Sequence, residues 1–306
     1  MPQRLYYCDH YEIALPESHK FPMSKYRLTR DILAGDGVFR FDCAPLAPRN
    51  VVELAHDREY VEQFVSGTLP AQAIRRIGFP WSDALVKRTL ASVGGTVAAA
   101  EQAVQTGWCG NLAGGTHHAF RAEGSGFCVF NDIAVAILYL RHHRGIAKAA
   151  VIDLDVHQGD GTAAIFENDP LVFTLSFHGR NNFPFRKQRS RVDIELDDGV
   201  GDDEYLKLVE EWLPRMFEFE PGVIFYQSGV DALATDRLGK LALTPEGIAR
   251  RNETVIRACR AYGAPLIVTM GGGYSEPVHL TAEAHANVYR TAHRVYENST
   301  TYRTSG

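Results

Sequence analysis

The sequence lacks long apolar runs. No segment of its 306 residues approaches the ~20 consecutive apolar residues of a transmembrane helix. The N-terminal stretch MPQRLYYCDHYEIALPE also lacks the apolar core of a signal peptide. We therefore expect a soluble, cytoplasmic protein that does not act at a membrane.

Cysteines are few and irregularly spaced. There are five, an odd number, and no two of them form a CxxC pair: Cys8, Cys43, Cys109, Cys128 and Cys259. This pattern favours reduced, mostly buried thiols in a reducing compartment over a disulfide framework.

An excess of positive charge is also missing. The chain has 32 basic and 37 acidic residues, a net charge of -5 and a pI near 6.2. That balance argues against a nucleic-acid-binding protein that relies on phosphate contacts. Neither internal repeats nor a linker divides the chain, so we expect a single domain over residues 1–306.

Short apolar segments alternate with helical patterns along the chain. The strongest segments, 149–155, 171–177, 223–229 and 265–273, are apolar on both faces, as buried parallel strands are. Residues 4–9 and 110–115 are weaker strand candidates. The alternation predicts an α/β fold with a central parallel sheet flanked by helices on both faces.

Three helices are predicted between these strands, each preceded by a capping residue: 83–107 after Ser82, 132–143 after Asn131, and 246–263 after Thr244-Pro245. The first is either one broken helix or two, with Gly94–Gly95 as the break. The segment 180–200 is expected to be a long irregular loop, and residues 294–306 a frayed tail.

Polar residues collect where the predicted strands end. They follow three strands, at 153–157, 228–231 and 271–274, and His117–His118 follow a fourth candidate. Ligand sites of open parallel sheets lie outside the carboxyl ends of the strands, so we expect these segments to meet there.

The segment VIDLDVHQGDG, residues 151–161, carries the densest set of such groups. If the strand continues, Asp153, Asp155 and His157 point to one face, since side chains alternate along a strand. Buried carboxylates that lie so near one another need a compensating cation. Asp155 and His157 with a third ligand, best supplied by Asp231, suit zinc with one position open for water. The alternative is that Asp155 and His157 only cap the next helix and bond to each other.

The chain has two pairs of adjacent histidines. His142–His143 lie in the charged segment RHHRG, which is typical of a helix end at the surface. His117–His118 lie between small and apolar residues and are expected to be partly buried, with Asp153 and Asp160 as available partners. Tyr274, after three glycines, is placed to donate a hydrogen bond to a polarised oxygen, or else is an aromatic side chain of the core.

Six motifs, in the same order along residues 5–290, resemble the zinc-dependent histone deacetylase family: AGGTHHAF, GFCVFND, VIDLDVHQGDG, LSFH, QSGVDAL with DRLG, and GGGY. The resemblance implies the arginase/deacetylase fold. Gln158 and the segments DRLGKLAL and GDDEYL resemble the class IV branch, and a bacterial homologue is expected.

The resemblance also implies roles for individual residues. Asp155, His157 and Asp231 correspond to the ligands of one zinc ion per chain. His117 and His118 correspond to the catalytic histidines, paired with Asp153 and Asp160, and Tyr274 to the tyrosine that polarises the acyl carbonyl. A potassium ion is implied at Asp153, Ser176 and Phe177, with backbone oxygens of Asp155 and His157. The tunnel for the acyl-lysine is implied to include Gly126, Phe127, Phe183, Leu238, Gly272 and Gly273.

The implied reaction removes an acyl group from a lysine side chain of a protein, or from a small acylated amine, with His118 as the better base. Three alternatives stay open. One is an acetylpolyamine or other small-molecule amidohydrolase, disfavoured by Leu238 where polyamine-selective relatives have a glutamate. Another is a ureohydrolase with two manganese ions, disfavoured because Asp231 has no second acid beside it. The third is a non-catalytic acyl-lysine binder, disfavoured by the intact histidines and Tyr274. No counterpart of the rim aspartate of class I enzymes is found.

Overall fold

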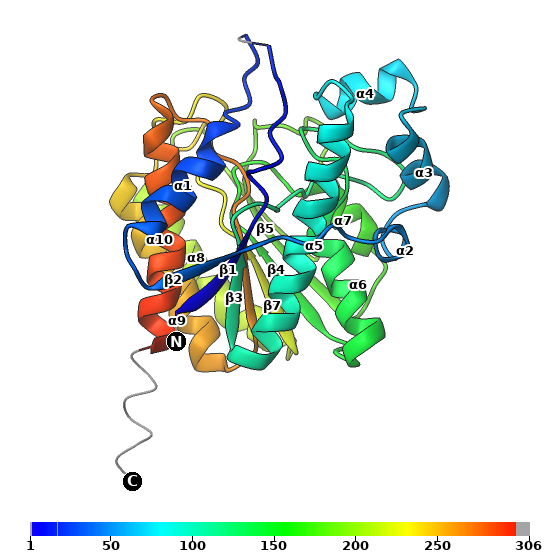
Figure 1. Ribbon diagram of the computed structural model, residues 1–306. Coiled ribbons are helices and arrows are strands. Elements are labelled where there is room, and N and C mark those ends of the chain that lie inside the picture. Colours follow the sequence, from blue (N-terminus) through cyan, green and yellow to red (C-terminus); the bar gives the residue numbers. More distant parts are fainter. Residues whose placement is uncertain (1, 17, 298–306) are drawn as a thin grey trace.

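The computed structural model describes residues 2–16 and 18–297. Its strands form one parallel sheet with the order β2-β1-β3-β8-β7-β4-β5-β6 (Figure 1). The strands are β1 (Gln3–Tyr7), β2 (Phe39–Cys43), β3 (Trp108–Asn111), β4 (Ala149–Asp153), β5 (Val172–Gly179), β6 (Val192–Leu196), β7 (Val223–Gln227) and β8 (Leu266–Thr269).

The predicted strands are confirmed and occupy most of the sheet. The four strongest apolar segments are β4, β5, β7 and β8, whose residues are all buried. The two strands that the sequence did not reveal, β2 and β6, are the edges. Each is only partly buried, so neither has a continuous apolar run. The expectation of an irregular loop over 180–200 was therefore wrong for β6.

Helices cover both faces of the sheet, as predicted (Figure 1). On one face α1 and α8–α10 pack side by side, and on the other α5 packs against α6 and α6 against α7. The helices are α1 (Ser24–Ala34), α2 (Arg49–Val52), α3 (Arg58–Ser66), α4 (Ala71–Ile77), α5 (Asp83–Thr106), α6 (Asp132–Arg144), α7 (Asp160–Phe166), α8 (Asp202–Phe217), α9 (Pro245–Tyr262) and α10 (Val278–Glu297).

The predicted helix starts are confirmed by their caps. The side chains of Ser82, Asn131 and Thr244 each accept a hydrogen bond from the backbone N–H three residues later, at 3.0–3.1 Å. The proposed break at Gly94–Gly95 was wrong, because α5 continues through both residues. A Cβ on Gly94 would lie 1.9 Å from the carbonyl oxygen of Pro45, so this glycine permits close packing of the helix.

The end of the chain also differs from the expectation of a frayed tail over 294–306. Residues 294–297 belong to α10, and Tyr296 is buried beside Trp108 at a ring-centroid distance of 6.0 Å. Residues 298–306 lie outside the described part of the chain. None of the described helices is long and apolar enough to cross a membrane.

Candidate active site

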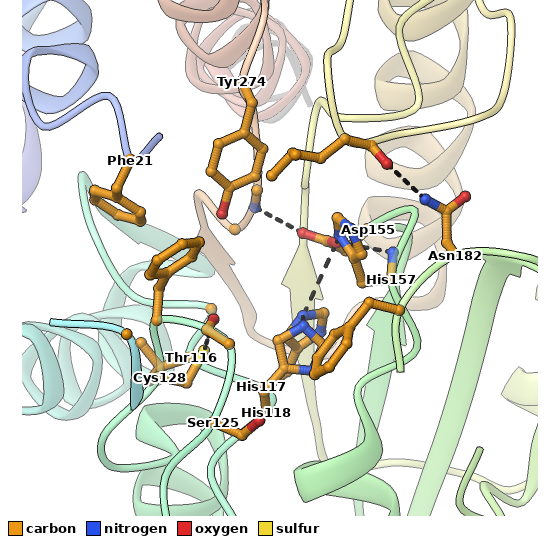
Figure 2. Close-up of a pocket in the computed structure, with 18 of the residues that line it drawn as sticks. Phe21, Thr116, His117, His118, Ser125, Cys128, Asp155, His157, Asn182 and Tyr274 are labelled. Atoms are coloured by element: carbon orange, nitrogen blue, oxygen red, sulfur yellow. Dashed lines mark hydrogen bonds and ion pairs between the residues drawn. The ribbon is translucent and has the colours of Figure 1, made fainter. Parts of the chain in front are cut away.

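The loops after β3, β4, β7 and β8 meet at the carboxyl edge of the sheet and surround a cavity of about 570 Å³ (Figure 2). The predicted polar groups after these strands lie together here, because parallel neighbours end at the same edge. His117, His118, Asp155, His157 and Tyr274 all line the cavity.

The loop after β4 turns sharply rather than continuing the strand. The strand ends at Asp153, whose Oδ1 accepts a hydrogen bond from the backbone N–H of Asp155 at 3.2 Å. The expectation that Asp153, Asp155 and His157 share one face of an extended strand was therefore wrong. The turn separates the three residues: Asp153 contacts His117, whereas Asp155 and His157 approach Asp231.

Asp155, His157 and Asp231 converge as a group of three possible metal ligands. Their ligand atoms lie within 4.8 Å of one another, and all three side chains are buried. The Nδ1 atom of His157 lies 3.0 Å from Oδ1 of Asp155 and 3.1 Å from Oδ2 of Asp231. The remaining carboxylate oxygens accept backbone N–H groups, from Gly272 at 2.6 Å and from Val156 at 2.8 Å. The two carboxylates are thus fixed in orientation.

The electrostatics of this group fit a cation. Burial, together with the charge of Asp155, raises the pKa of Asp231 to about 7. Burial opposes a charge on His157, yet the two carboxylates raise the pKa of this imidazole to about 10. Asp155, His157 and Asp231 thus bind a proton between them, and a metal ion in its place would balance the charge of the two carboxylates. Two oxygens and one nitrogen are a donor set that zinc accepts, with a position left for water or substrate.

The adjacent histidines are each held by a carboxylate. Nδ1 of His117 lies 2.7 Å from Asp153, Nδ1 of His118 lies 2.7 Å from Asp160, and the two Nε2 atoms are 3.1 Å apart. Burial alone would lower the pKa of His117, but the charges of Asp153 and Asp155 raise it to about 9.

His118 differs from its neighbour in charge. Burial, followed by the positive charge on His117, lowers the pKa of His118 to about 4 despite its bond to Asp160. The pair therefore combines a protonated and a neutral imidazole, so it offers one proton donor and one proton acceptor side by side.

Asp132 fixes the loop that carries the histidines, and the sequence analysis did not single it out. Its buried carboxylate accepts the backbone N–H groups of Gly115 at 3.1 Å and Thr116 at 2.7 Å, and the hydroxyls of Thr96 and Thr116 at 2.6 Å. A carboxylate with no solvent exposure that accepts four hydrogen bonds holds the loop in one conformation.

Tyr274 lies across the cavity from the histidines, with its hydroxyl directed into the cavity (Figure 2). Burial, followed by the charges of Asp231 and Asp155, raises the pKa of this phenol well above its usual value, so the hydroxyl stays a donor. Asp236 accepts the backbone N–H of Tyr274 at 2.6 Å and that of Leu238 at 2.8 Å. This shared carboxylate joins the loop after β7 to the loop that carries the tyrosine.

Comparison with known proteins agrees with this geometry. The model of the histone deacetylase domain matches residues 19–291. This chain belongs to the histone deacetylase family. It is 45% identical over 291 residues to an uncharacterised protein of Picosynechococcus sp., covering 94% of this chain and 97% of that protein.

More distant relatives have names that state an activity. Histone deacetylase 2 of Arabidopsis thaliana is 31% identical and covers 88% of this chain, which spans 73% of the plant protein. Human histone deacetylase 1 is 30% identical over 85% of this chain and 58% of the human protein. Membership of the family supports an amide hydrolase of the deacetylase type and the arginase/deacetylase fold.

The predicted tunnel residues of this histone deacetylase family member lie around the cavity, with one exception. Gly126, Phe127, Phe183, Leu238 and Gly272 line it. Phe183 packs edge-on against His118 at a ring-centroid distance of 5.0 Å. The exception is Gly273, which is not a lining residue: its backbone faces the interior, where a Cβ would meet Thr281 and Val230 at 2.7 Å.

The residues expected around potassium lie on neighbouring strands. Asp153 on β4 pairs in register with Ser176 on β5, and Phe177 follows in the same strand. All three residues are buried. The Ser176 hydroxyl lies 2.9 Å from Nδ1 of His178. A potassium ion between these residues stays a prediction.

Residues near the N-terminus complete the inner part of the cavity, and the sequence analysis missed them. Phe21 and Tyr26 line the cavity. Lys25 lies behind Tyr274, fully buried, with its Nζ 5.1 Å from the centre of the tyrosine ring. It donates to the carbonyl oxygens of Gly271 at 3.1 Å and Gly273 at 3.4 Å. A lysine in an amphipathic helix normally lies at the surface, so the pattern gave no sign of this position.

Proposed function

We propose that the chain is a zinc-dependent lysine deacylase that removes acyl groups from lysine side chains and releases a carboxylate and a free amine. The observation that carries this proposal is the convergence of three buried metal ligands, two carboxylate-bound histidines and a tyrosine hydroxyl on one cavity. We also propose that residues 1–306 act as a single domain and that the enzyme is cytoplasmic.

One zinc ion per chain is proposed at Asp155, His157 and Asp231. When bound, zinc supplies Lewis-acid polarisation of the amide carbonyl and activation of the attacking water. The hydrogen bonds of Asp155 to Gly272 N–H and of Asp231 to Val156 N–H orient both carboxylates for this ion. A structural potassium ion at Asp153, Ser176 and Phe177 belongs to the same proposal.

The histidines divide the proton transfers between them. His118 is neutral at working pH and accepts the proton of the attacking water, with Asp160 fixing its tautomer through Nδ1. The same imidazole then returns a proton to the nitrogen of the leaving amine. His117, protonated through its contact with Asp153, keeps positive charge beside the reacting centre. It thereby stabilises the negative charge that develops there.

Tyr274 and the tunnel walls act on the substrate itself. The tyrosine hydroxyl donates a hydrogen bond to the carbonyl oxygen as charge develops on it. Phe127 and Phe183 are apolar walls that suit the methylene stem of lysine. Leu238 provides no carboxylate for the second ammonium of an acyl-polyamine, which favours acyl-lysine over polyamines. The assignment of the chain to the class IV branch is part of the same proposal.

The decisive experiment follows amine release from an acetyl-lysine peptide by the purified chain, stripped of metal and then titrated with zinc. We expect activity to rise to a maximum at one zinc per chain. Arginine and agmatine with manganese, and N8-acetylspermidine with zinc, are tested in parallel. Hydrolysis of arginine with two manganese ions, or binding of the peptide without turnover at full zinc loading, would contradict the proposal.

A further inference from the structure

The entrance of the cavity, which we call its mouth, carries basic residues. Apart from the histidines, three basic residues line the cavity, Arg75 and Arg76 of α4 and Lys240 of the loop after β7, and all three are exposed. The only carboxylate among the lining residues is Asp155, which is buried at the metal group. A substrate that approaches the floor of the cavity, where Asp155 and the histidines lie, therefore first meets positive charge.

The basic residues at the entrance are unequally neutralised. Arg76 forms an ion pair with Glu123, and Nζ of Lys240 lies 3.8 Å from an oxygen of Asp198. The side chain of Arg75 has no ion pair or hydrogen bond with any other described residue. Ion pairs at the surface compensate charge only partly, and Arg75 is not compensated at all.

The wall formed by the loop after β5 adds further positive charge. Residues 180–191, RNNFPFRKQRSR, contain five basic residues and no acidic ones. Arg180 is paired with Asp197 at 3.1 Å, and Arg189 and Arg191 line a separate pocket, so Arg186 and Lys187 are the basic residues of this segment to consider near the entrance. Lys187 fixes the loop by donating to the carbonyl oxygens of Asn182 at 2.6 Å and Pro184 at 2.8 Å. Arg186 is exposed and has no ion-pair partner among the described residues.

The same loop also presents an aromatic side chain to solvent. Phe185 lines the cavity and is 86% exposed, more than any other large apolar residue that the structure describes. Arg186 follows Phe185 in the chain and is exposed, so a cation stands next to this apolar contact, just outside the residues that line the cavity. Such a pair suits a substrate with a side chain to pack on the ring and a carboxylate to meet the guanidinium.

We infer that this mouth selects acyl-lysines whose neighbouring residues are acidic, and disfavours lysine-rich segments and acyl-polyamines. The inference rests on the proposed deacylase function and concerns the segment around the acyl-lysine. Complementary charge speeds encounter and stabilises the complex, whereas like charges placed together are penalised.

The test compares three acetyl-lysine peptides of equal length, flanked by aspartate and glutamate, by serine and glycine, or by lysine and arginine. Each exposed charge pair contributes a factor of about 1.5 to 5. With several pairs, we expect kcat/KM for the acidic peptide to exceed that for the basic one by about tenfold at low salt. The ratio should approach one near 1 M salt, where the Debye length falls to about 3 Å.

Variants locate the effect. Arg75→Glu should lower the acidic-to-basic ratio at least threefold, because the exposed, unpaired arginine becomes a carboxylate. The matched control is Lys207→Glu: Lys207 is exposed on α8, does not line the cavity and has no ion pair with a described residue. The control should leave the ratio unchanged. An equal or higher kcat/KM for the basic peptide, or an equal change in the control, would overturn the inference.

Binding separates this inference from the proposed function. The dissociation constants of the three peptides, labelled with a fluorophore, are measured by fluorescence polarisation on the same zinc-loaded protein. Turnover of all peptides without a charge preference in kcat/KM or binding refutes the cationic mouth alone. Absence of turnover refutes the deacylase. In that case, tighter binding of the acidic peptide still supports the mouth, and equal or weaker binding refutes it.

Discussion

The floor and the mouth of the cavity differ in burial and in the sign of their charge. On the floor, the carboxylates of Asp153, Asp155 and Asp231 are buried, and each has a histidine within 3.1 Å. At the mouth, Arg75 is exposed and unpaired among the described residues, and Phe185 is mostly exposed. The floor concentrates buried carboxylates that could hold a metal ion, whereas the mouth carries exposed positive charge.

The difference shows how burial sets the size of an electrostatic effect. A charge removed from a buried, hydrogen-bonded group leaves its partner uncompensated, which costs several kcal/mol. A charge changed at an exposed position is screened by water and salt and changes the free energy by about 1 kcal/mol or less. Substitutions on the floor should therefore abolish activity, whereas those at the mouth should alter the choice of substrate.

The largest effect is expected on removing a metal ligand. Asp231→Ala should lose both zinc and turnover, because the group keeps only one carboxylate and one imidazole. Zinc content after dialysis and the rate with acetyl-lysine peptide measure the two losses. Full zinc occupancy in this variant would remove Asp231 from the ligand set.

The next effect separates a buried histidine from an exposed one. His118→Asn should reduce kcat by about 10²–10⁴, the usual contribution of a general base. His142→Asn is the matched control, since His142 belongs to the other histidine pair and is exposed at the end of α6. Steady-state rates at saturating substrate decide the comparison. Comparable rates for the two variants would show that His118 is not the base.

Loss of the tyrosine hydroxyl should cost somewhat less. Tyr274→Phe keeps the ring and the metal ligands but removes one donor to the developing oxyanion, which typically costs about 10²–10³ in rate. Zinc content and the melting temperature should stay close to those of the wild type. A variant with nearly normal kcat would contradict the role of Tyr274 as an oxyanion donor.

The buried lysine behind Tyr274 should affect the pH dependence of stability. Burial lowers the pKa of Lys25 to about 8, despite the opposing charges of Asp231 and Asp155. Between about pH 8 and 10.5 the unfolded chain binds the proton that the folded chain has released, so raising the pH favours the folded state. Compared with Lys25→Met, the wild type should gain up to about 3 kcal/mol of unfolding free energy over this range. Urea unfolding at several pH values measures the gain, and parallel curves for the two proteins would refute it.

The smallest effect is expected at the mouth. Leu238→Glu should shift the ratio of kcat/KM toward N8-acetylspermidine by a factor of about 5, since a carboxylate near an ammonium contributes about 1 kcal/mol at a partly wet site. The wild type should prefer acyl-lysine when both substrates compete in one assay. A wild type that prefers the polyamine would show that Leu238 does not decide this choice.

Much of the fold was predictable because it depends on local patterns. Runs such as 149–155 are apolar on both faces, and Ser82, Asn131 and Thr244 mark helix starts by their side-chain oxygens. The edge strands β2 and β6 escaped prediction because their half-exposed residues lack that pattern. The glycines of α5 were misjudged, since Gly94 packs against Pro45 and Gly95 against Asn111, and both partners lie outside the helix.

The candidate site, like the fold, was only partly predictable from the sequence. The sequence by itself determined which chemical groups the site contains, since the order of the motifs indicates a hydrolase of the deacetylase type and the spacing of Asp155 and His157 predicts a metal site. The family resemblance also implied the pairs His117–Asp153 and His118–Asp160, and both contacts are present. Only the tertiary structure decided that β4 ends at Asp153 and that the chain turns there, away from an extended strand. It also decided that Lys25 is buried against the loop of Tyr274 and that Arg75 stands at the mouth. Such placements follow from packing between distant segments, which local residue patterns do not encode.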